Sequence, residues 1–238
     1  MLHFILGYER YLKIFSILKI KTLSLDSRKA DFLYFNEIIK DNATVVVIGA
    51  CTGITTIPFA KGKTMRKIFA YEPLPSNFEV LNKLVNFFNL NNVHTYNIGL
   101  GNKIENRELL LPVLKGVKKQ GMAHIIDKTI VEYNEGLIEM IEIATLDSRT
   151  ELNSIKIDAI KIVAENFEYE IFEGAKKIIE FNKPLIYCEL WDNDKRNKVL
   201  KLIEEYNYTI YYRKGNALFP YEKSDYLGKN FFFKPTNA

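Results

Sequence analysis

A run of β-branched residues that ends in two closely spaced glycines is the feature that most constrains the fold. Residues 44–48 read TVVVI, and the turn at 49–53 reads GACTG. A β-branched run without polar alternation is typical of a strand covered on both faces. Glycines directly after it let backbone N–H groups approach a ligand. Glu72 follows a second short strand at roughly 20 residues from Gly49, the spacing at which an acid binds a ribose diol. These features predict a doubly wound α/β fold with a pocket for an adenosine-containing cofactor.

The rest of the chain alternates short apolar runs with helical patterns, as expected of βα units in a mostly parallel sheet. The strands predicted for the centre of the sheet are residues 44–48, 67–71, 93–98, 159–163 and 185–190. Aromatic strands at 208–212 and 230–233 predict an antiparallel C-terminal hairpin at one edge. We expect a helix after Ser76, with that serine as its cap, and another over residues 167–181.

The domain organisation predicted from these patterns has two parts, an N-terminal helical segment over residues 1–40 and an α/β domain over residues 41–238. Apolar residues from Ile5 to Ile20 form a helical stripe with lysines and an arginine between them. Such a helix packs on the domain, forms a dimer contact or lies on a membrane surface. Its charges interrupt it before the ~20 apolar residues that a membrane span needs. The glycine- and lysine-rich segment 101–136, with a possible strand at 107–111, predicts a mobile loop over a site, followed by an edge strand over 138–146.

Charge and cysteine content exclude several classes of partner. Lys and Arg number 33 against 29 Asp and Glu, so the signs are mixed and no nucleic-acid partner is expected. The two cysteines, Cys51 and Cys188, are too few for a disulfide framework or a zinc site. We therefore expect a cytoplasmic protein.

The identity of the cofactor follows from what the glycine turn lacks. A dinucleotide needs G-x-G-x-x-G, with the middle glycine against the pyrophosphate. Here Cys51 occupies that position and the third glycine is absent. S-adenosylmethionine has a ribose and an adenine but no phosphate, so the turn and the acid favour this methyl donor over a nicotinamide.

Six sequence blocks resemble the FkbM-type S-adenosylmethionine-dependent methyltransferases. They are VVVIGACTG (45–53), FAYEPLPSNFEVLNKLVNFFNLNNV (69–93), NIGLGN (97–102), IEIATLDS (141–148), IDAIKIVAENFEYEIFEGA (157–175) and KPLIYCEL (183–190). The resemblance covers about residues 41–191. It implies a Rossmann-like class I methyltransferase fold with a mostly parallel, seven-stranded sheet. It also implies O-methylation of a hydroxyl of a sugar in a glycan or glycoconjugate, with S-adenosyl-L-methionine as cofactor and a saccharide as acceptor.

The resemblance also implies roles for individual residues. Those expected to bind the cofactor are Gly49, Ala50, Cys51, Thr52, Gly53, Glu72, Pro73, Asn77, Asn97, Leu100 and Asn102. Transfer to a hydroxyl needs a base, and the candidates are Glu165, which matches the acid of the family's D-V-E-G block, Glu189 at the end of the fifth strand, and His124. No metal is expected, because no histidine supports the two carboxylates.

The chain departs from the family pattern at four positions. Val47 and Val163 stand where the family usually has acids, Asn102 stands for an aspartate, and Asn166 for the glycine of D-V-E-G. Two alternatives therefore stay open. One is a catalytically impaired FkbM-like binding or scaffold protein, and the other is a nicotinamide-dependent oxidoreductase.

Overall fold

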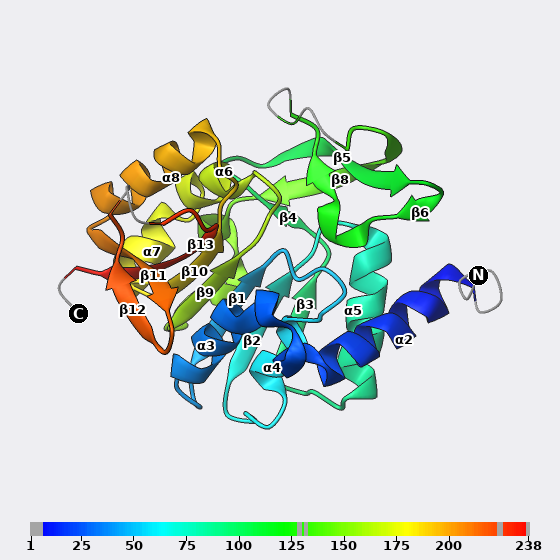
Figure 1. Ribbon diagram of the computed structural model, residues 1–238, viewed down its shortest axis with the longest axis horizontal. Coiled ribbons are helices and arrows are strands. Elements are labelled where there is room, and N and C mark those ends of the chain that lie inside the picture. Colours follow the sequence, from blue (N-terminus) through cyan, green and yellow to red (C-terminus); the bar gives the residue numbers. More distant parts are fainter. Residues whose placement is uncertain (1–6, 128–129, 131–132, 223–225, 237–238) are drawn as a thin grey trace.

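The computed structural model describes residues 7–127, 130, 133–222 and 226–236, and Ile5 of the predicted helical stripe lies outside them. Figure 1 shows a central sheet with helices on both sides and a smaller sheet against one end of it. The two sheets and the helices between them share a large apolar core.

The main sheet is built around five parallel strands, which are β1 (Thr44–Ile48), β2 (Lys67–Tyr71), β3 (Val93–Tyr96), β9 (Ala159–Ile162) and β10 (Leu185–Glu189). All of β1 is buried. Val46 and Ile48 pack into the core on one face of the sheet, and Val45 and Val47 pack into the core on the other. The absence of polar alternation in the sequence of β1 thus has its expected cause, a strand covered on both sides.

Three C-terminal strands complete the main sheet, β11 (Tyr208–Lys214), β12 (Ala217–Pro220) and β13 (Asn230–Pro235). The two aromatic strands pair antiparallel as predicted, but they do not form a hairpin at the edge, because β12 follows β11 and pairs with it at the edge, and β13 lies between β11 and β10. The strand order among the described residues is β12-β11-β13-β10-β9-β1-β2-β3. The expected seven-stranded, mostly parallel sheet is not confirmed, since β12 adds an eighth strand and the sheet is mixed.

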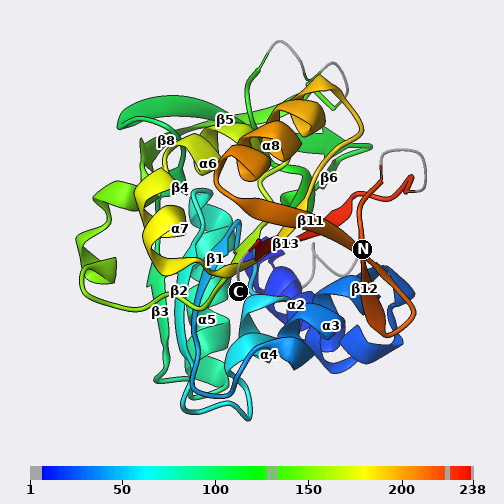
Figure 2. The ribbon, with the colours of Figure 1, turned by 90° about the vertical axis from the view of Figure 1, so that its left-hand side faces the viewer.

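Helices cover both faces of the main sheet (Figure 2). The helices α3 (Ala30–Ile38), α4 (Thr56–Ala60) and α5 (Pro75–Phe87) lie on one face, and α6 (Glu168–Glu173), α7 (Lys176–Asn182) and α8 (Asp194–Glu205) lie on the other. The prediction of one helix over 167–181 is wrong, because Gly174 separates α6 from α7. A Cβ on Gly174 would lie 1.9 Å from the carbonyl oxygen of Gly101, so a close tertiary approach breaks the helix there. Ser76 does not cap α5, which begins at Pro75 after Leu74 and has no side-chain cap.

The segment predicted as a mobile loop contains several strands. They are β5 (Glu105–Leu114), β6 (Val117–Lys118) and β7 (His124–Ile125), with the short helix η3 (Gln120–Met122) between β6 and β7, and β4 (Gly99–Leu100) directly precedes the segment. These strands form a five-stranded sheet with β8 (Gly136–Ala144), which pairs with β4 on one side and β5 on the other. β8 is therefore an interior strand of the second sheet and not the expected edge strand.

The N-terminal part consists of α2 (Tyr8–Lys21), the short helices η1 (Leu23–Leu25) and η2 (Ser27–Lys29), and then α3. One side of α2 packs against α5, where Leu12 joins a small apolar cluster with Val80 and Leu84. The buried hydroxyl of Ser16 donates to that of Thr52 at 2.8 Å. Among the described residues, no helix combines the length and apolarity that crossing a membrane requires.

Candidate functional site

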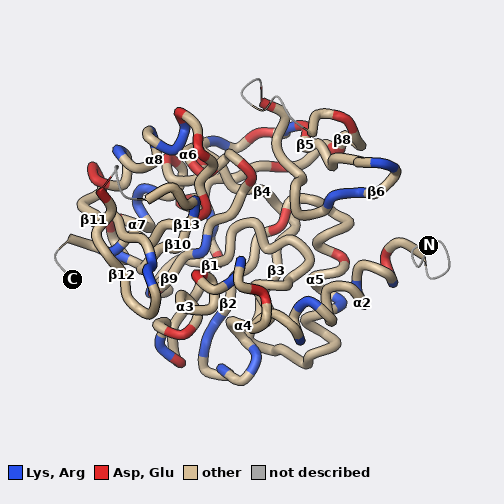
Figure 3. The backbone as a smooth tube through the Cα atoms, in the orientation of Figure 1, with Lys and Arg blue, Asp and Glu red and all other residues tan. Residues whose placement is uncertain are grey.

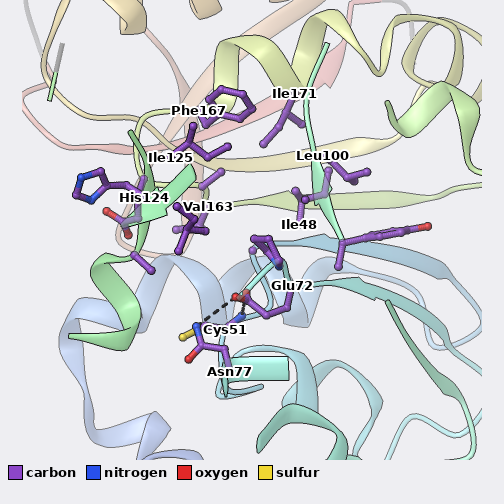
Figure 4. Close-up of a pocket in the computed structure, with 18 of the residues that line it drawn as sticks. Ile48, Cys51, Glu72, Asn77, Leu100, His124, Ile125, Val163, Phe167 and Ile171 are labelled. Atoms are coloured by element: carbon purple, nitrogen blue, oxygen red, sulfur yellow. Dashed lines mark hydrogen bonds between the residues drawn. The ribbon is translucent and has the colours of Figure 1, made fainter. Parts of the chain in front are cut away.

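A pocket lies at the carboxyl ends of β1, β2 and β9, under the second sheet. In open α/β sheets, this is the edge at which ligands bind. Its lining comes from the glycine turn, from the acid after β2, from the loop after β9, and from the segment at residues 117–125, which we call the roof. Figure 4 shows Glu72, Cys51 and Asn77 on one side of this pocket and His124 on another.

The glycine turn is held close to the end of β9. Gly49 has a φ of +73°, and a Cβ there would lie 1.8 Å from the carbonyl oxygen of Val163, so only glycine fits. The N–H groups of Gly49 and Ala50 donate to the carbonyl oxygen of Tyr71 at 3.1 and 3.0 Å. Cys51 also has a positive φ, of 50°. This backbone conformation, which is costly for a non-glycine residue, leaves the N–H of Cys51 directed at Glu72.

The carboxylate of Glu72 is buried and fixed by three donors. Its Oε2 accepts from the N–H of Cys51 at 2.7 Å, and its Oε1 accepts from the N–H of Leu74 at 3.1 Å and from Nδ2 of Asn77 at 3.2 Å. Burial raises the pKa of Glu72, and these hydrogen bonds oppose that shift. The acid after β2 is thus positioned before any ligand arrives.

Several buried polar atoms around the pocket have no hydrogen-bond partner among the described residues. They include Oδ1 of Asn77, Oε1 of Gln120 and Nε2 of His124. Buried polar atoms are normally paired, so these three atoms fit a polar ligand. The remaining wall is apolar and suits a flat aromatic ring, since it is lined by Ile48, Ile98, Leu100, Leu109, Ile125, Ile143, Phe167 and Ile171. The pocket therefore fits a nucleoside that carries hydroxyl groups.

The roof connects the pocket to the N-terminal helix. The carbonyl oxygen of Gln120 accepts from Nδ2 of Asn77 at 3.4 Å and from Sγ of Cys51 at 3.9 Å. The side chain of Gln120 donates to the hydroxyl of Tyr8 at 3.4 Å. One residue of the roof thus contacts the turn, the helix α5 and the helix α2.

Carboxylates gather where β9 and β10 end. Glu165 has a φ of +47° and borders the pocket. Burial and the nearby charge of Glu189 raise the pKa of Glu165 to about 7. Glu168 is buried beside it and accepts from the N–H of Ala164 at 2.8 Å. Glu189 forms an ion pair with Lys229. Among the described residues, no group of side chains is arranged to hold a metal ion.

His124 in β7 reaches the pocket from the roof. Its Nδ1 lies 2.9 Å from the carbonyl oxygen of Met122. A carbonyl oxygen only accepts, so Nδ1 is the donor of this contact, and in the neutral imidazole the buried Nε2 is then an acceptor. His124 is therefore available as an acceptor or base at the edge of the pocket.

Eight of the residues expected in the site line this pocket: Gly49, Cys51, Glu72, Pro73, Asn77, Leu100, His124 and Glu165. The other six expected residues are not part of the lining. Thr52 faces Ser16, Gly53 packs against Leu81, and Ala50 is buried under the turn. Nδ2 of Asn97 donates to the carbonyl oxygens of Glu72 and Pro73 at 2.8 and 2.9 Å.

The last two of these six lie farther out. Asn102 donates to Glu173 at the surface, and Glu189 pairs with Lys229 outside the lining. The roles of all fourteen residues in binding or catalysis stay predictions.

The lining residues that were not among the predicted site residues include Gln120, Ile125, Phe167 and Ile171. The glycine- and lysine-rich segment indicated a cover over the site, but nothing in its composition indicated which residues face inward. Phe167 follows the A-E-N block directly, and its position beside Glu165 was the one available signal.

The sequence pattern of the Methyltransferase FkbM domain matches residues 48–210. The chain belongs to the FkbM methyltransferase family. Its cofactor is S-adenosylmethionine. A nicotinamide-dependent oxidoreductase, one of the two alternatives left open by the sequence, is therefore set aside. No protein with a curated description matches the chain in sequence.

Solved structures agree with the family in fold. The methyltransferase FkbM from Methylobacillus flagellatus KT is 13% identical, with a TM-score of 0.54 over 83% of this chain and 45% of that one. A SAM-dependent O-methyltransferase from Thermotoga maritima is 11% identical, with a TM-score of 0.50 over 88% of this chain and 65% of that one. The chain thus spans about half of the first relative and under two thirds of the second. The fold is that of the class I methyltransferases.

Proposed function

We propose that this protein is an S-adenosylmethionine-dependent O-methyltransferase that acts on a hydroxyl of a sugar in a glycan or glycoconjugate. The observation that carries the proposal is a single pocket that joins the carboxylate of Glu72 to that of Glu165. The first suits the ribose of a nucleoside, and the second is a carboxylate in the same pocket that could take a proton from an acceptor.

The cofactor end of the pocket has two acceptor positions for the two ribose hydroxyls. An ionised carboxylate has about four lone-pair sites, and three on Glu72 are occupied by the donors from Cys51, Leu74 and Asn77. One site on Glu72 and Oδ1 of Asn77 therefore stay available. When bound, S-adenosylmethionine supplies an electrophilic methyl group on a sulfonium.

Glu165 is our first candidate for the base. A base works best when its pKa lies near the operating pH, and burial raises the pKa of Glu165 to about 7. In its ionised form the carboxylate takes the proton of the acceptor hydroxyl. Nε2 of His124 is a second acceptor in the same pocket. Glu189 supports the role of Glu165 by raising its pKa.

Trp191 and Asp192, directly after β10, support a sugar as the acceptor. Trp191 hydrogen-bonds Glu165 and is partly exposed, and the side chain of Asp192 is 85% exposed. An aromatic face with hydrogen-bonding carboxylates beside it suits the C–H and O–H groups of a sugar ring.

Calorimetry tests the cofactor half of the proposal. We expect S-adenosylmethionine to bind the unmodified protein and to bind Glu72→Ala roughly 10–100-fold more weakly, because hydrogen bonds to charged groups are lost. Glu204→Gln, a change at an exposed residue of α8, is the matched control and should bind as the unmodified protein does. The cofactor assignment fails if the unmodified protein does not bind.

Transfer of a labelled methyl group to a panel of saccharides tests the catalytic half. The rate should rise with pH through about 7, as Glu165 loses its proton. Glu165→Gln should lower kcat by roughly 10²–10⁴-fold and remove this rise, with cofactor affinity unchanged. Cofactor binding without transfer to any saccharide would instead favour the impaired binding protein that Val47 and Val163 suggest.

A further inference from the structure

The outward side of the N-terminal helix is apolar. The side chains of Ile14, Phe15 and Leu18 in α2 are 42%, 39% and 57% exposed, and that of Leu25 in η1 is 82% exposed. Ile14 and Leu18 are four residues apart in α2, the spacing of one face of a helix, and Leu25 lies in the short helix η1 that follows. The inward side, with Leu12 and Ser16, is buried.

The charges within this stretch are basic, and the two acids that flank it are in ion pairs, Glu9 with Lys83 and Asp26 with Arg28. Between Arg10 and Leu25 the chain has four basic residues, Arg10, Lys13, Lys19 and Lys21, and no acid. In the whole chain, by contrast, 33 basic residues are nearly balanced by 29 acidic ones. In Figure 3, α2 has several blue segments along its length and one red segment near its N-terminal end. Lys19 lies over the ring of Phe15 at 5.8 Å, so the cations and the apolar residues form one surface.

We propose that this face of α2 and η1 docks on an anionic lipid membrane. Apolar side chains of an interfacial helix enter the boundary between headgroups and acyl chains, while lysines and arginines bind the anionic headgroups. Four exposed apolar residues interleaved with four basic ones are the pattern that such binding needs.

A second copy of the chain is a poorer occupant for the same face. A two-fold dimer apposes the same patch on both subunits, so it would place the basic residues of one copy against those of the other. Like charges held together in this way weaken an interface. An anionic surface complements these charges.

The docking face is tied to the cofactor pocket. Ser16, on the inward side of α2, bonds Thr52 in the glycine turn, and Tyr8 bonds Gln120 in the roof. A membrane bound through α2 therefore lies in a fixed relation to the pocket. The inference does not depend on which acceptor is methylated.

Flotation with lipid vesicles tests the proposal. The probes are vesicles of phosphatidylcholine alone and of phosphatidylcholine and phosphatidylglycerol in equal parts. The unmodified protein should float with the anionic vesicles at least tenfold more than with the neutral ones, and added salt should release it. Lys19→Gln with Lys21→Gln should weaken binding roughly 25-fold, at about fivefold for each cation near the surface.

Two double variants at exposed positions separate a loss of vesicle binding from a loss of folding. Phe15→Ser with Leu18→Ser should abolish flotation without changing the thermal unfolding temperature. Lys198→Gln with Lys201→Gln, which removes the same charge from the exposed side of α8, should bind as the unmodified protein does. Equal binding to both vesicle types, or equal loss in the α8 control, would overturn the proposal. The proposal would also be overturned if light scattering showed the unmodified protein to be a dimer, if Phe15→Ser with Leu18→Ser made it a monomer, and if the unmodified protein bound no vesicles.

Discussion

Replacing Glu168 with glutamine should change how the stability of the protein depends on pH. Glu168 lies in α6, is 3% exposed and accepts a hydrogen bond from the N–H of Ala164. Burial raises its pKa to about 8, and the charges of Glu165 and Glu189 add to that shift. The folded protein therefore holds the proton of Glu168 more tightly than the unfolded chain does.

The sign and size of the effect follow from that difference in pKa. A raised pKa gives stability that is fully present below the ordinary value of 4.5 and is lost as the pH rises through about 8. Each pKa unit corresponds to 1.36 kcal/mol. Between pH 5 and pH 9 the contribution of Glu168 to the free energy of unfolding should therefore fall by about 4 kcal/mol.

The variant Glu168→Gln is neutral at every pH, and its amide oxygen can still accept from Ala164. Urea unfolding at pH 5, 7 and 9 should show the variant gaining about 4 kcal/mol relative to the unmodified protein across this range. Glu204→Gln on the exposed side of α8 is the control and should show no such gain. A difference between Glu168→Gln and the unmodified protein that stays constant from pH 5 to pH 9 would refute the reasoning.

Three further substitutions test the framework by urea unfolding. Gly49→Ala should destabilise by more than about 2 kcal/mol, because its Cβ would meet the Val163 carbonyl at a positive φ; an effect under ~0.5 kcal/mol would contradict the close approach. Arg66→Met should cost about 3 kcal/mol or more, because the fully buried guanidinium donates to Asn36 and to backbone carbonyls after α3. If Arg66→Met is as stable as the unmodified protein, water must hydrate the oxygen atoms that Arg66 contacts, and the expectation is wrong. Ser16→Ala should cost about 1 kcal/mol through its bond to Thr52, and no loss would mean that α2 is held by apolar packing alone.

The central strands could be predicted from the sequence because burial on both faces leaves a local signature. The bounds predicted for the first two strands, 44–48 and 67–71, are those of β1 and β2. The place of the glycine turn and Glu72 in the pocket could also be predicted, because a turn after one strand and an acid after the next meet at the same edge of the sheet. The side of the pocket that consists of the glycine turn and Glu72 could therefore be predicted from the sequence.

The roof could not be predicted in the same way, because non-local pairing creates it. β5 pairs with β8 and β7, and this pairing decides that His124 and Ile125 face the pocket. The break at Gly174 has the same kind of cause, the approach of Gly101 from a distant loop. Composition identified segment 101–136 as a cover, but only tertiary contacts make it a sheet.

The lost acids at Val47 and Val163 have a physical consequence that the sequence alone did not reveal. Lys161 in β9 lies beside Val47 in β1, and an acid at position 47 would adjoin its ammonium group. Lys161 is buried here, its Nζ donates to the carbonyl oxygen of Gly49 at 3.3 Å, and burial lowers its pKa to about 8. A buried ammonium needs a partner, and the carbonyl of the glycine turn serves as one. We therefore expect the departures to remove charge without releasing the turn, and the substitutions at Glu72 and Glu165 test whether binding and methyl transfer depend on those two acids instead.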